Sequence, residues 1–279
     1  MPFSLDEFEA RSPAISARQW RDRLTRGESL IGLWNVSASP INAEILGMSG
    51  ADWIILDAEH SANDIAVLVP QLQTLAALPV FTVVRAPSKD PLILGRLLDI
   101  GARGLMVPMI ETAEEASAVV EATRYSPRGR RGVGGGFARA ARWNGISDYL
   151  STAEQSFSLI AQIETEKSVA NLADILDVDG IDAVFFGPAD LAASLGLLGQ
   201  ARHQHVRELI LNGIETVVSS GRIAGVNAFS HEDARLYQSA GARLLAVGAD
   251  VTILTSGSVG IVDSFAAPAP APVSASKGH

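Results

Sequence analysis

Two carboxylates in the sequence lie just after apolar runs that are typical of buried strands. Glu164 and Asp190 follow the fifth and sixth of eight such runs. Neighbouring parallel strands lie about 4.8 Å apart, so both carboxylates can reach one hard cation. Two protein carboxylates leave positions open for water or a chelating substrate, which suits Mg²⁺ or Mn²⁺. The alternative is that each caps a helix, but the pair beside His60 and Arg85 favours a metal site.

A histidine and an arginine at other run ends could move a proton and hold a negative charge. His60 is the only one of the five histidines directly after a run. Asp57 could orient its ring and raise its pKa, with Glu59 as the alternative orienter. Arg85 ends an apolar run, where a charge needs an anionic partner. That partner is either a carboxylate or enolate ligand, or a salt bridge to Asp57 or Glu59.

Lysine-based carbonyl chemistry is not expected from this sequence. Its three lysines are Lys89, Lys167 and Lys277, and none lies within an apolar run. A Schiff base requires a lysine held in a desolvated site. Any carbonyl chemistry here is therefore expected to be metal-assisted.

The elements that position these residues alternate regularly along the chain. Amphipathic stretches separate most of the apolar runs, which are typical of parallel strands buried on both faces. This alternation favours a closed (β/α)8 TIM barrel over an open doubly wound sheet, whose glycine-rich phosphate turn is missing. The expected strands are Leu30–Trp34, Trp53–Asp57, Phe81–Arg85, Gly104–Met109, Ser158–Ile163, Ala183–Gly187, Ile223–Asn227 and Leu244–Gly248.

The longest break in this alternation, residues 126–144, is rich in glycine and arginine. Long loops in barrels are usually functional, so we interpret it as an active-site flap rather than a plain surface loop. Residues 1–265 are expected to form one domain. Residues 266–279 are rich in Ala and Pro and are expected to be extended or disordered, without a chemical role.

Composition excludes several classes of protein. Hydrophobic residues make up 47% and charged residues 19%, so the chain of 279 residues can bury a large core. The net charge of −9 and the lack of a basic stretch argue against a nucleic-acid partner. The absence of cysteine excludes disulfides, thiolate metal sites and cysteine nucleophiles. No signal peptide or membrane span is recognisable, so we expect a cytoplasmic protein with no membrane partner.

From about Leu30 to Ser256 the sequence resembles the HpcH/HpaI aldolase family, the metal-dependent class II pyruvate aldolases. The motifs that carry the resemblance are Ile31-Gly32-Leu33-Trp34, Asp52-Trp53-Ile54-Ile55-Leu56-Asp57-Ala58-Glu59-His60, Val84-Arg85, Leu97-Leu98-Asp99-Ile100-Gly101, Val107-Pro108-Met109, Arg131-Gly132-Val133-Gly134, Gln162-Ile163-Glu164-Thr165 and Gly187-Pro188-Ala189-Asp190-Leu191.

The resemblance implies a role for each matching residue. Glu164 and Asp190 would ligate a divalent cation, Mg²⁺ or Mn²⁺, with Co²⁺ and Zn²⁺ as alternatives. Arg85 would contact the keto oxygen of pyruvate, and His60 with Asp57 would be the acid/base pair. The residues expected to bind substrate are Trp34, Gln162, Gly187, Pro188 and Ala189, with the backbone amides of 187–190 holding the carboxylate.

The resemblance also implies an assembly. It indicates a barrel whose last helix is exchanged between subunits, in a homohexamer built as a trimer of dimers. Asp99 would enter the site of a neighbouring subunit. Gly134-Gly135-Gly136-Phe137 and Asn227-Ala228-Phe229 depart from the family pattern on the side that receives the aldehyde.

The expected function is therefore that of a lyase acting on small molecules. It would reversibly cleave 4-hydroxy-2-keto acids to pyruvate, or a related 2-keto acid, and an aldehyde. The metal and Arg85 would stabilise the enolate, and the base would be His60 or a metal-bound water that His60 activates. The alternatives on the same barrel are a citryl- or malyl-CoA-type lyase and an oxaloacetate decarboxylase. The intact set of site residues argues against a barrel without catalytic activity.

Overall fold

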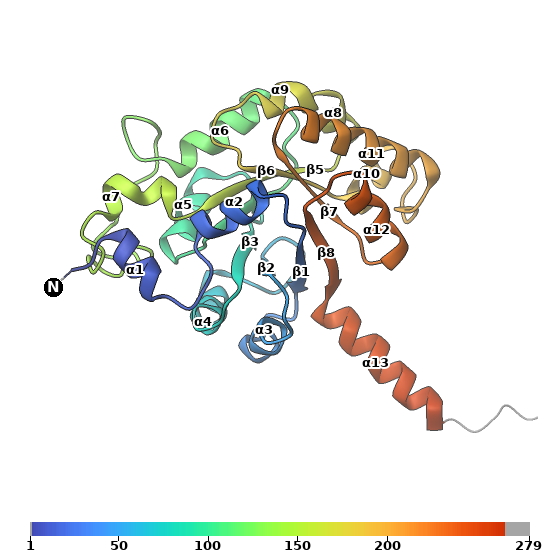
Figure 1. The fold of residues 1–279 in the computed structure, drawn as a ribbon, viewed down its shortest axis with the longest axis horizontal. Coiled ribbons are helices and arrows are strands. Elements are labelled where there is room, and N and C mark those ends of the chain that lie inside the picture. Colours follow the sequence, from blue (N-terminus) through green and yellow to red (C-terminus); the bar gives the residue numbers. More distant parts are fainter. Residues whose placement is uncertain (1, 266–279) are drawn as a thin grey trace, which may run out of the picture.

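Eight parallel strands pair in the order of the chain, and the last returns to the first, so the sheet closes into a barrel (Figure 1). The computed structural model describes residues 2–265, and the expected tail at 266–279 lies outside them. The (β/α)8 barrel expected from the alternation is confirmed. The strands are β1 (Leu30–Asn35), β2 (Trp53–Asp57), β3 (Phe81–Arg85), β4 (Gly104–Val107), β5 (Ser158–Ile163), β6 (Ala183–Phe186), β7 (Ile223–Asn227) and β8 (Leu244–Ala249).

Helices connect the strands and cover the outside of the barrel (Figure 1). They are α1 (Leu5–Arg11), α2 (Ala17–Thr25), α3 (Pro40–Gly47), α4 (Ile65–Leu75), α5 (Pro91–Asp99), α6 (Ala113–Thr123), α7 (Tyr149–Thr152), a 3₁₀ turn at Ala153–Gln155, α8 (Glu166–Ala170), α9 (Leu172–Leu176), α10 (Pro188–Ser194), α11 (Gln204–Ser219), α12 (His231–Ser239) and α13 (Asp250–Phe265). Among residues 2–265, no helix is both long enough and apolar enough to cross a membrane.

The core has two layers, one inside the barrel and one between the strands and the helices. Inside, Trp53 is fully buried and leaves no room on β1, where a Cβ on Gly32 would lie 2.3 Å from its ring. Helix α2 closes the N-terminal end of the barrel, because its Trp20 stacks on Phe81 with the ring centroids 4.5 Å apart. This packed interior leaves the C-terminal strand ends as the rim on which a site can form.

Turn chemistry read from the sequence sets where several elements begin and end. Asp90 accepts hydrogen bonds from the backbone N–H of Leu92 and Ile93 at 2.8 and 3.2 Å, with Pro91 as the first helical residue of α5. Gly101 follows the helix with a φ of +94°, a left-handed conformation that favours glycine. The chain can then turn directly into β4.

The interpretation of residues 126–144 as a flap over the active site of the same chain is wrong. Helix α6 lies between β4 and this loop, so the chain has already returned to the N-terminal end of the barrel before the loop begins. There the Arg139 guanidinium donates to the carbonyl of Ile100 at 2.9 Å, just after α5. The backbone N–H of Ala140 donates to the carbonyl of Asp99 at 3.0 Å.

The last helix projects away from the barrel, as Figure 1 shows. Its first residue, Asp250, is buried and accepts hydrogen bonds from the backbone N–H of Val36 and Ser37 at 2.9 and 3.1 Å. Every later residue of α13 is exposed. Its apolar side chains therefore lack a partner within the part of the chain that the structure describes.

Candidate active site

A cavity of about 280 Å³ opens at the C-terminal end of the barrel. It brings together most of the residues that the sequence predicts for the site. Those at its wall are Trp34, Asp57, His60, Arg85, Gln162, Gly187, Pro188, Ala189 and Asp190. Glu164 is buried and forms a hydrogen bond with Gln162 of this wall.

Arg85 is held in place by a buried two-point ion pair. The register of β2 and β3 places Asp57 opposite Arg85. The Arg85 Nε donates to Asp57 Oδ1, and Nη2 donates to Oδ2, each at 2.8 Å. Nη1 lies 3.0 Å from Glu59 Oε2, and the guanidinium lies 4.5 Å from the centroid of the Trp34 ring. Both salt bridges considered for Arg85 are therefore present, and Trp34 supports the guanidinium from its face.

The structure does not show the expected pairing of Asp57 with the His60 ring: both Asp57 carboxylate oxygens accept from Arg85, and within residues 2–265 no hydrogen bond joins Asp57 to that ring. Asp57 meets His60 only at its backbone N–H, at 3.5 Å. The ring Nε2 of His60 lies instead 3.7 Å from Glu59 Oε2. Glu59, the alternative orienter, thus lies between His60 and Arg85. Burial raises the pKa of Glu59 above its ordinary value, although Arg85 acts in the opposite direction.

Glu164 has both oxygens engaged at the floor of the site. Its Oε1 accepts a hydrogen bond from the Met109 backbone N–H at 2.8 Å, and its Oε2 accepts one from Gln162 Nε2. Burial raises the pKa of Glu164 to about 7, and the negative charges of Asp190 and Glu59 act in the same direction. A buried carboxylate in this state gains strongly from a nearby cation.

The alternative of two helix caps does not hold for these carboxylates. The residue that caps α8 is Thr165, whose side chain accepts the Ser168 backbone N–H. The residue before α10 is Gly187, and Asp190 lies within the first turn of that helix. Neither Glu164 nor Asp190 is needed as a cap, which leaves both available as ligands.

The polar atoms around Glu164 fit a hard cation. The Gln162 Oε1 is buried and makes no hydrogen bond within the described residues. A Cβ on Gly187 would lie 2.6 Å from Glu164 Oε2, so glycine keeps this carboxylate approachable. Residues 2–265 contain no cluster of three or more His, Cys, Asp or Glu suited to a metal. A cation held by Glu164 and Asp190 would therefore take its remaining ligands from water or substrate.

The outer wall of the cavity contains Asn227 and Phe229, from the segment expected on the aldehyde side, and Thr252, which the sequence analysis did not single out. Asn227 ends β7, Phe229 lies two residues beyond it, and Thr252 comes from the start of α13. Asn227 Oδ1 accepts a hydrogen bond from Trp34 Nε1 at 3.1 Å, which links this wall to the support of Arg85. The position of Asn227 at a strand end was a usable signal, whereas nothing in the sequence indicates that Thr252 turns back toward the site.

Asp99 and the described lysines lie outside this cavity. Asp99, at the end of α5, has its Oδ1 2.7 Å from Arg131 Nη2. Lys89 Nζ lies 2.8 Å from Glu115 Oε2, and Lys167 Nζ lies 3.1 Å from Glu111 Oε2. Neither lysine is therefore placed to form a Schiff base in the site.

Comparisons with known proteins agree with this geometry. The sequence pattern of the HpcH/HpaI aldolase/citrate lyase family matches residues 30–256. A hydroxypyruvate/pyruvate aldolase from Delftia acidovorans is 43% identical over 240 residues, which cover 86% of this chain and 89% of the relative. A 4-hydroxy-2-oxo-heptane-1,7-dioate aldolase from Salmonella dublin is 43% identical over 248 residues, covering 89% and 94%.

A solved structure is also closely similar in fold. It is an HpcH/HpaI aldolase/citrate lyase family protein from Burkholderia cenocepacia J2315. The two share 40% identity and superpose with a TM-score of 0.84, over 88% of this chain and 98% of that one.

Proposed function

Because the chain belongs to the HpcH/HpaI aldolase/citrate lyase family, we propose that it is a divalent-metal-dependent class II aldolase, a carbon–carbon lyase. Its reaction is the reversible cleavage of 4-hydroxy-2-keto acids to pyruvate, or a related 2-keto acid, and an aldehyde. The names of two relatives that are 43% identical support this reaction class. One observation carries the proposal. The Arg85 guanidinium, fixed by Asp57, lies at the same cavity as buried oxygen atoms of Glu164 and Gln162 that could ligate a cation.

In this proposal Arg85 binds and polarises the keto oxygen of the substrate. Two hydrogen bonds to Asp57 fix the guanidinium before substrate arrives, so little reorganisation is needed when negative charge develops. The first turn of α10 supplies the backbone N–H groups of Ala189 and Asp190, which have no acceptor within the helix. These amides are suited to hold the substrate carboxylate.

Glu164 and Asp190 would hold the cation, Mg²⁺ or Mn²⁺, with Gln162 beside them. A cation bound there supplies Lewis-acid stabilisation of the charge on the keto oxygen. Gly187 leaves space beside Glu164, whose burial favours a positive partner, and Asp190 offers a second, exposed carboxylate.

His60 is the candidate for proton transfer at the substrate. Its ring is exposed to the cavity, with Glu59 at 3.7 Å to orient it. The ring takes the proton of the 4-hydroxyl group during cleavage, directly or through a water molecule. In the reverse direction it returns that proton to the new hydroxyl.

The aldehyde part of the substrate lies against Asn227 and Phe229 in this proposal. Phe229 is 47% exposed at the cavity wall, so it offers an apolar surface to the aldehyde. Asn227 offers the one polar group from the β7 end of this wall. Substitution of Phe229 is therefore expected to change the preferred aldehyde more than the affinity for pyruvate.

A second copy of the chain would complete the site. Helix α13 carries exposed Ile253 and Leu254, and α3 exposes Ile41 and Ile45 on the outside of the barrel. Exchange of α13 between subunits covers both sets of side chains, in a hexamer built as a trimer of dimers. Asp99 would then reach the site of a neighbour. Analytical ultracentrifugation tests this assembly, and a monomer at micromolar concentration contradicts it.

The test of the reaction is release of pyruvate from a panel of 4-hydroxy-2-keto acids. The purified protein is treated with EDTA and then assayed with and without added Mg²⁺ or Mn²⁺. We expect pyruvate only when metal is returned. Parallel assays with oxaloacetate and with citryl- and malyl-CoA separate the alternatives: turnover of a CoA thioester or of oxaloacetate that exceeds all aldol cleavage contradicts the proposal.

A further inference from the structure

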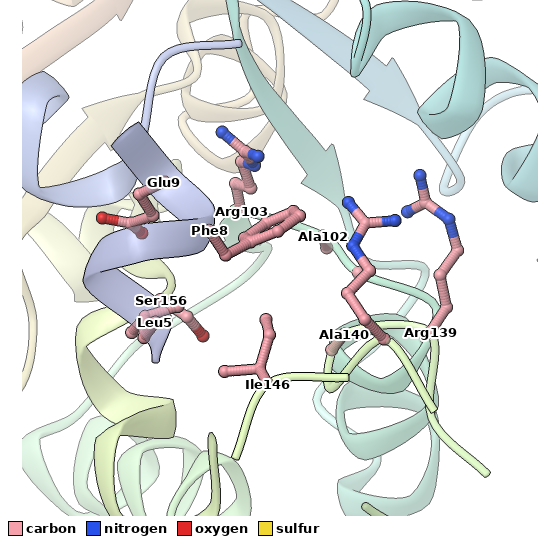
Figure 2. Close-up of a pocket in the computed structure, with 11 residues that line it drawn as sticks. Leu5, Phe8, Glu9, Ala102, Arg103, Arg139, Ala140, Ile146 and Ser156 are labelled. Carbon is pink, nitrogen blue, oxygen red and sulfur yellow. The ribbon is translucent and has the colours of Figure 1, made fainter. Parts of the chain in front are cut away.

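A second cavity lies at the opposite end of the barrel from the active site. It has a volume of about 40 Å³ and lies between α1, the turn before β4 and the loop that precedes α7. Among residues 2–265, its wall carries three arginines, Arg103, Arg139 and Arg142, but a single carboxylate, Glu9. Figure 2 shows the ring of Phe8 beside Arg103, with Arg139 approaching from the loop on the right.

Neutral groups hold two of these arginines in position. Arg103 donates to the backbone carbonyls of Ala14 and Ile15 at 2.9 and 2.8 Å and to Ser12 Oγ at 3.0 Å. Arg139 donates to the carbonyls of Ile100 and Leu72 at 2.9 and 3.3 Å. These bonds fix the guanidinium groups in the wall but neutralise neither charge.

Arg142 is less well satisfied. Its guanidinium carbon lies 4.6 Å from the centroid of the Phe8 ring. Its Nε is buried and has no hydrogen-bond partner within the described residues. A buried donor without an acceptor destabilises a protein, so the structure would gain from an acceptor placed here.

The charge in this cavity is unbalanced. Burial lowers the pKa of Arg103 and of Arg139 to about 10, and repulsion from Arg142 contributes to both shifts. Burial likewise raises the pKa of Glu9, which Arg103 partly opposes. The charged groups facing the cavity are thus three guanidinium groups and one carboxylate, an excess of two positive charges.

We propose that this arginine pocket binds a small oxyanion with two negative charges, of the size of inorganic phosphate or sulfate. Two negative charges match the excess of the wall, and planar guanidinium groups are well suited to tetrahedral oxyanions. One water needs about 10–15 Å³ of such volume, so the cavity of about 40 Å³ has room for a group of this size. The bound anion would join α1 to the loop at residues 126–148 and stabilise the fold.

The test is calorimetric titration of the whole protein with inorganic phosphate and, separately, with sulfate. Sodium chloride at equal ionic strength is the control. We expect a dissociation constant of about 1 mM or below for at least one dianion, and the tighter of the two identifies the preferred source. At 20 mM this binding should raise the melting temperature by about 4 °C. Absence of binding of both dianions up to 20 mM overturns the proposal.

Three variants locate the binding. Arg142→Gln removes a charge without breaking a hydrogen bond among the described residues, and should weaken phosphate binding at least tenfold. Glu9→Gln removes the competing carboxylate and should tighten binding at least threefold, which a purely structural role of the arginines would not produce. Arg85→Gln removes the arginine of the active site and should leave binding unchanged.

The opposite pattern overturns the proposal. Loss of phosphate binding in Arg85→Gln, with retention in Arg142→Gln, would place the anion in the active site. If Arg142→Gln does not fold, Glu9→Gln decides alone: unchanged or weaker binding in that variant contradicts the charge argument. Failure here leaves the aldolase assay unaffected, because the two cavities share no residue.

Discussion

The buried pair of Asp57 and Arg85 gives the sharpest mutational prediction. The two side chains are 2% and 8% exposed and share two hydrogen bonds of 2.8 Å. Asp57→Asn keeps the shape but removes the charge, so one oxygen of the pair becomes an amide that cannot accept from the guanidinium. Removing one partner of a buried ion pair costs about 3–5 kcal/mol. Glu59, 3.0 Å from Arg85, compensates in part, so we expect about 3 kcal/mol.

The same substitution should lower activity, because Arg85 is then no longer held toward the keto oxygen. Loss of one donor to a developing oxyanion costs roughly 10²–10³ in rate. Thermal unfolding measures the first effect, where about 3 kcal/mol corresponds to a fall in melting temperature of about 6–12 °C. Pyruvate release at saturating metal measures the second.

A double-mutant cycle separates this account from the alternative in which Asp57 serves His60. Asp57→Asn combined with Arg85→Ala should be little worse than Arg85→Ala alone, because the two residues act as one unit. Asp57→Asn combined with His60→Ala should instead multiply the two losses. The pairing of Asp57 with Arg85 would be refuted if the losses of activity in Asp57→Asn and Arg85→Ala multiplied, while those in Asp57→Asn and His60→Ala did not.

Three further predictions concern single residues. Arg85→Ala should slow exchange of the pyruvate methyl protons into heavy water roughly 10²–10³-fold, with metal affinity measured by calorimetry little changed; equal exchange rates would show that Arg85 does not stabilise the enolate. Burial raises the pKa of Glu164 to about 7, so its ionisation opposes folding of the metal-free protein increasingly between about pH 4.5 and 7. Glu164→Gln should therefore raise the melting temperature of the metal-free protein at pH 8 but not at pH 4. The same substitution should abolish activity. A lower melting temperature of the variant at pH 8 would contradict the argument from burial. His60→Ala should slow aldol cleavage and flatten the acidic limb of the pH–rate profile. Because the His60 ring is exposed, the melting temperature should not change. An unchanged acidic limb would show that His60 does not transfer the proton.

Much of the fold could be predicted because the strands are nearly continuous apolar runs. β2, β3, β5 and β7 have the predicted bounds, and the other four differ by one or two residues at their ends. The glycines at 50, 101, 180 and 241 all have positive φ, as expected of residues that end helices before a strand. Local chemistry sufficed for these features.

The partners of the site residues could not be predicted in the same way. The pairing of Asp57 with Arg85 depends on the register between β2 and β3, which places the two residues opposite each other. Their separation of 28 residues in the chain carries no information about that register. Because His60 is close to Asp57 in sequence, it was the expected partner of Asp57. In the barrel, the strand register pairs Asp57 with Arg85 instead.

The predicted position of the long loop at residues 126–144 is wrong for a topological reason. The glycine and arginine content of residues 126–144 suggested a functional loop. A loop lies, however, at the end of the barrel where the preceding element ends. Helix α6 returns the chain to the N-terminal end of the barrel, where Arg139 and Arg142 line the arginine pocket. The charge of this loop therefore belongs to a different cavity from the one first considered.

In the function proposed for it, this site forms the enolate of pyruvate with a divalent cation held by Glu164 and Asp190. Exchange of the pyruvate methyl protons for deuterium, without any aldehyde and read by mass spectrometry, tests it most directly. We predict no exchange above the buffer rate in chelator-treated protein and full exchange after Mg²⁺ or Mn²⁺ is returned. Asp190→Asn should not recover exchange with either metal. Full exchange in the metal-free protein, or in Asp190→Asn, would contradict the claim.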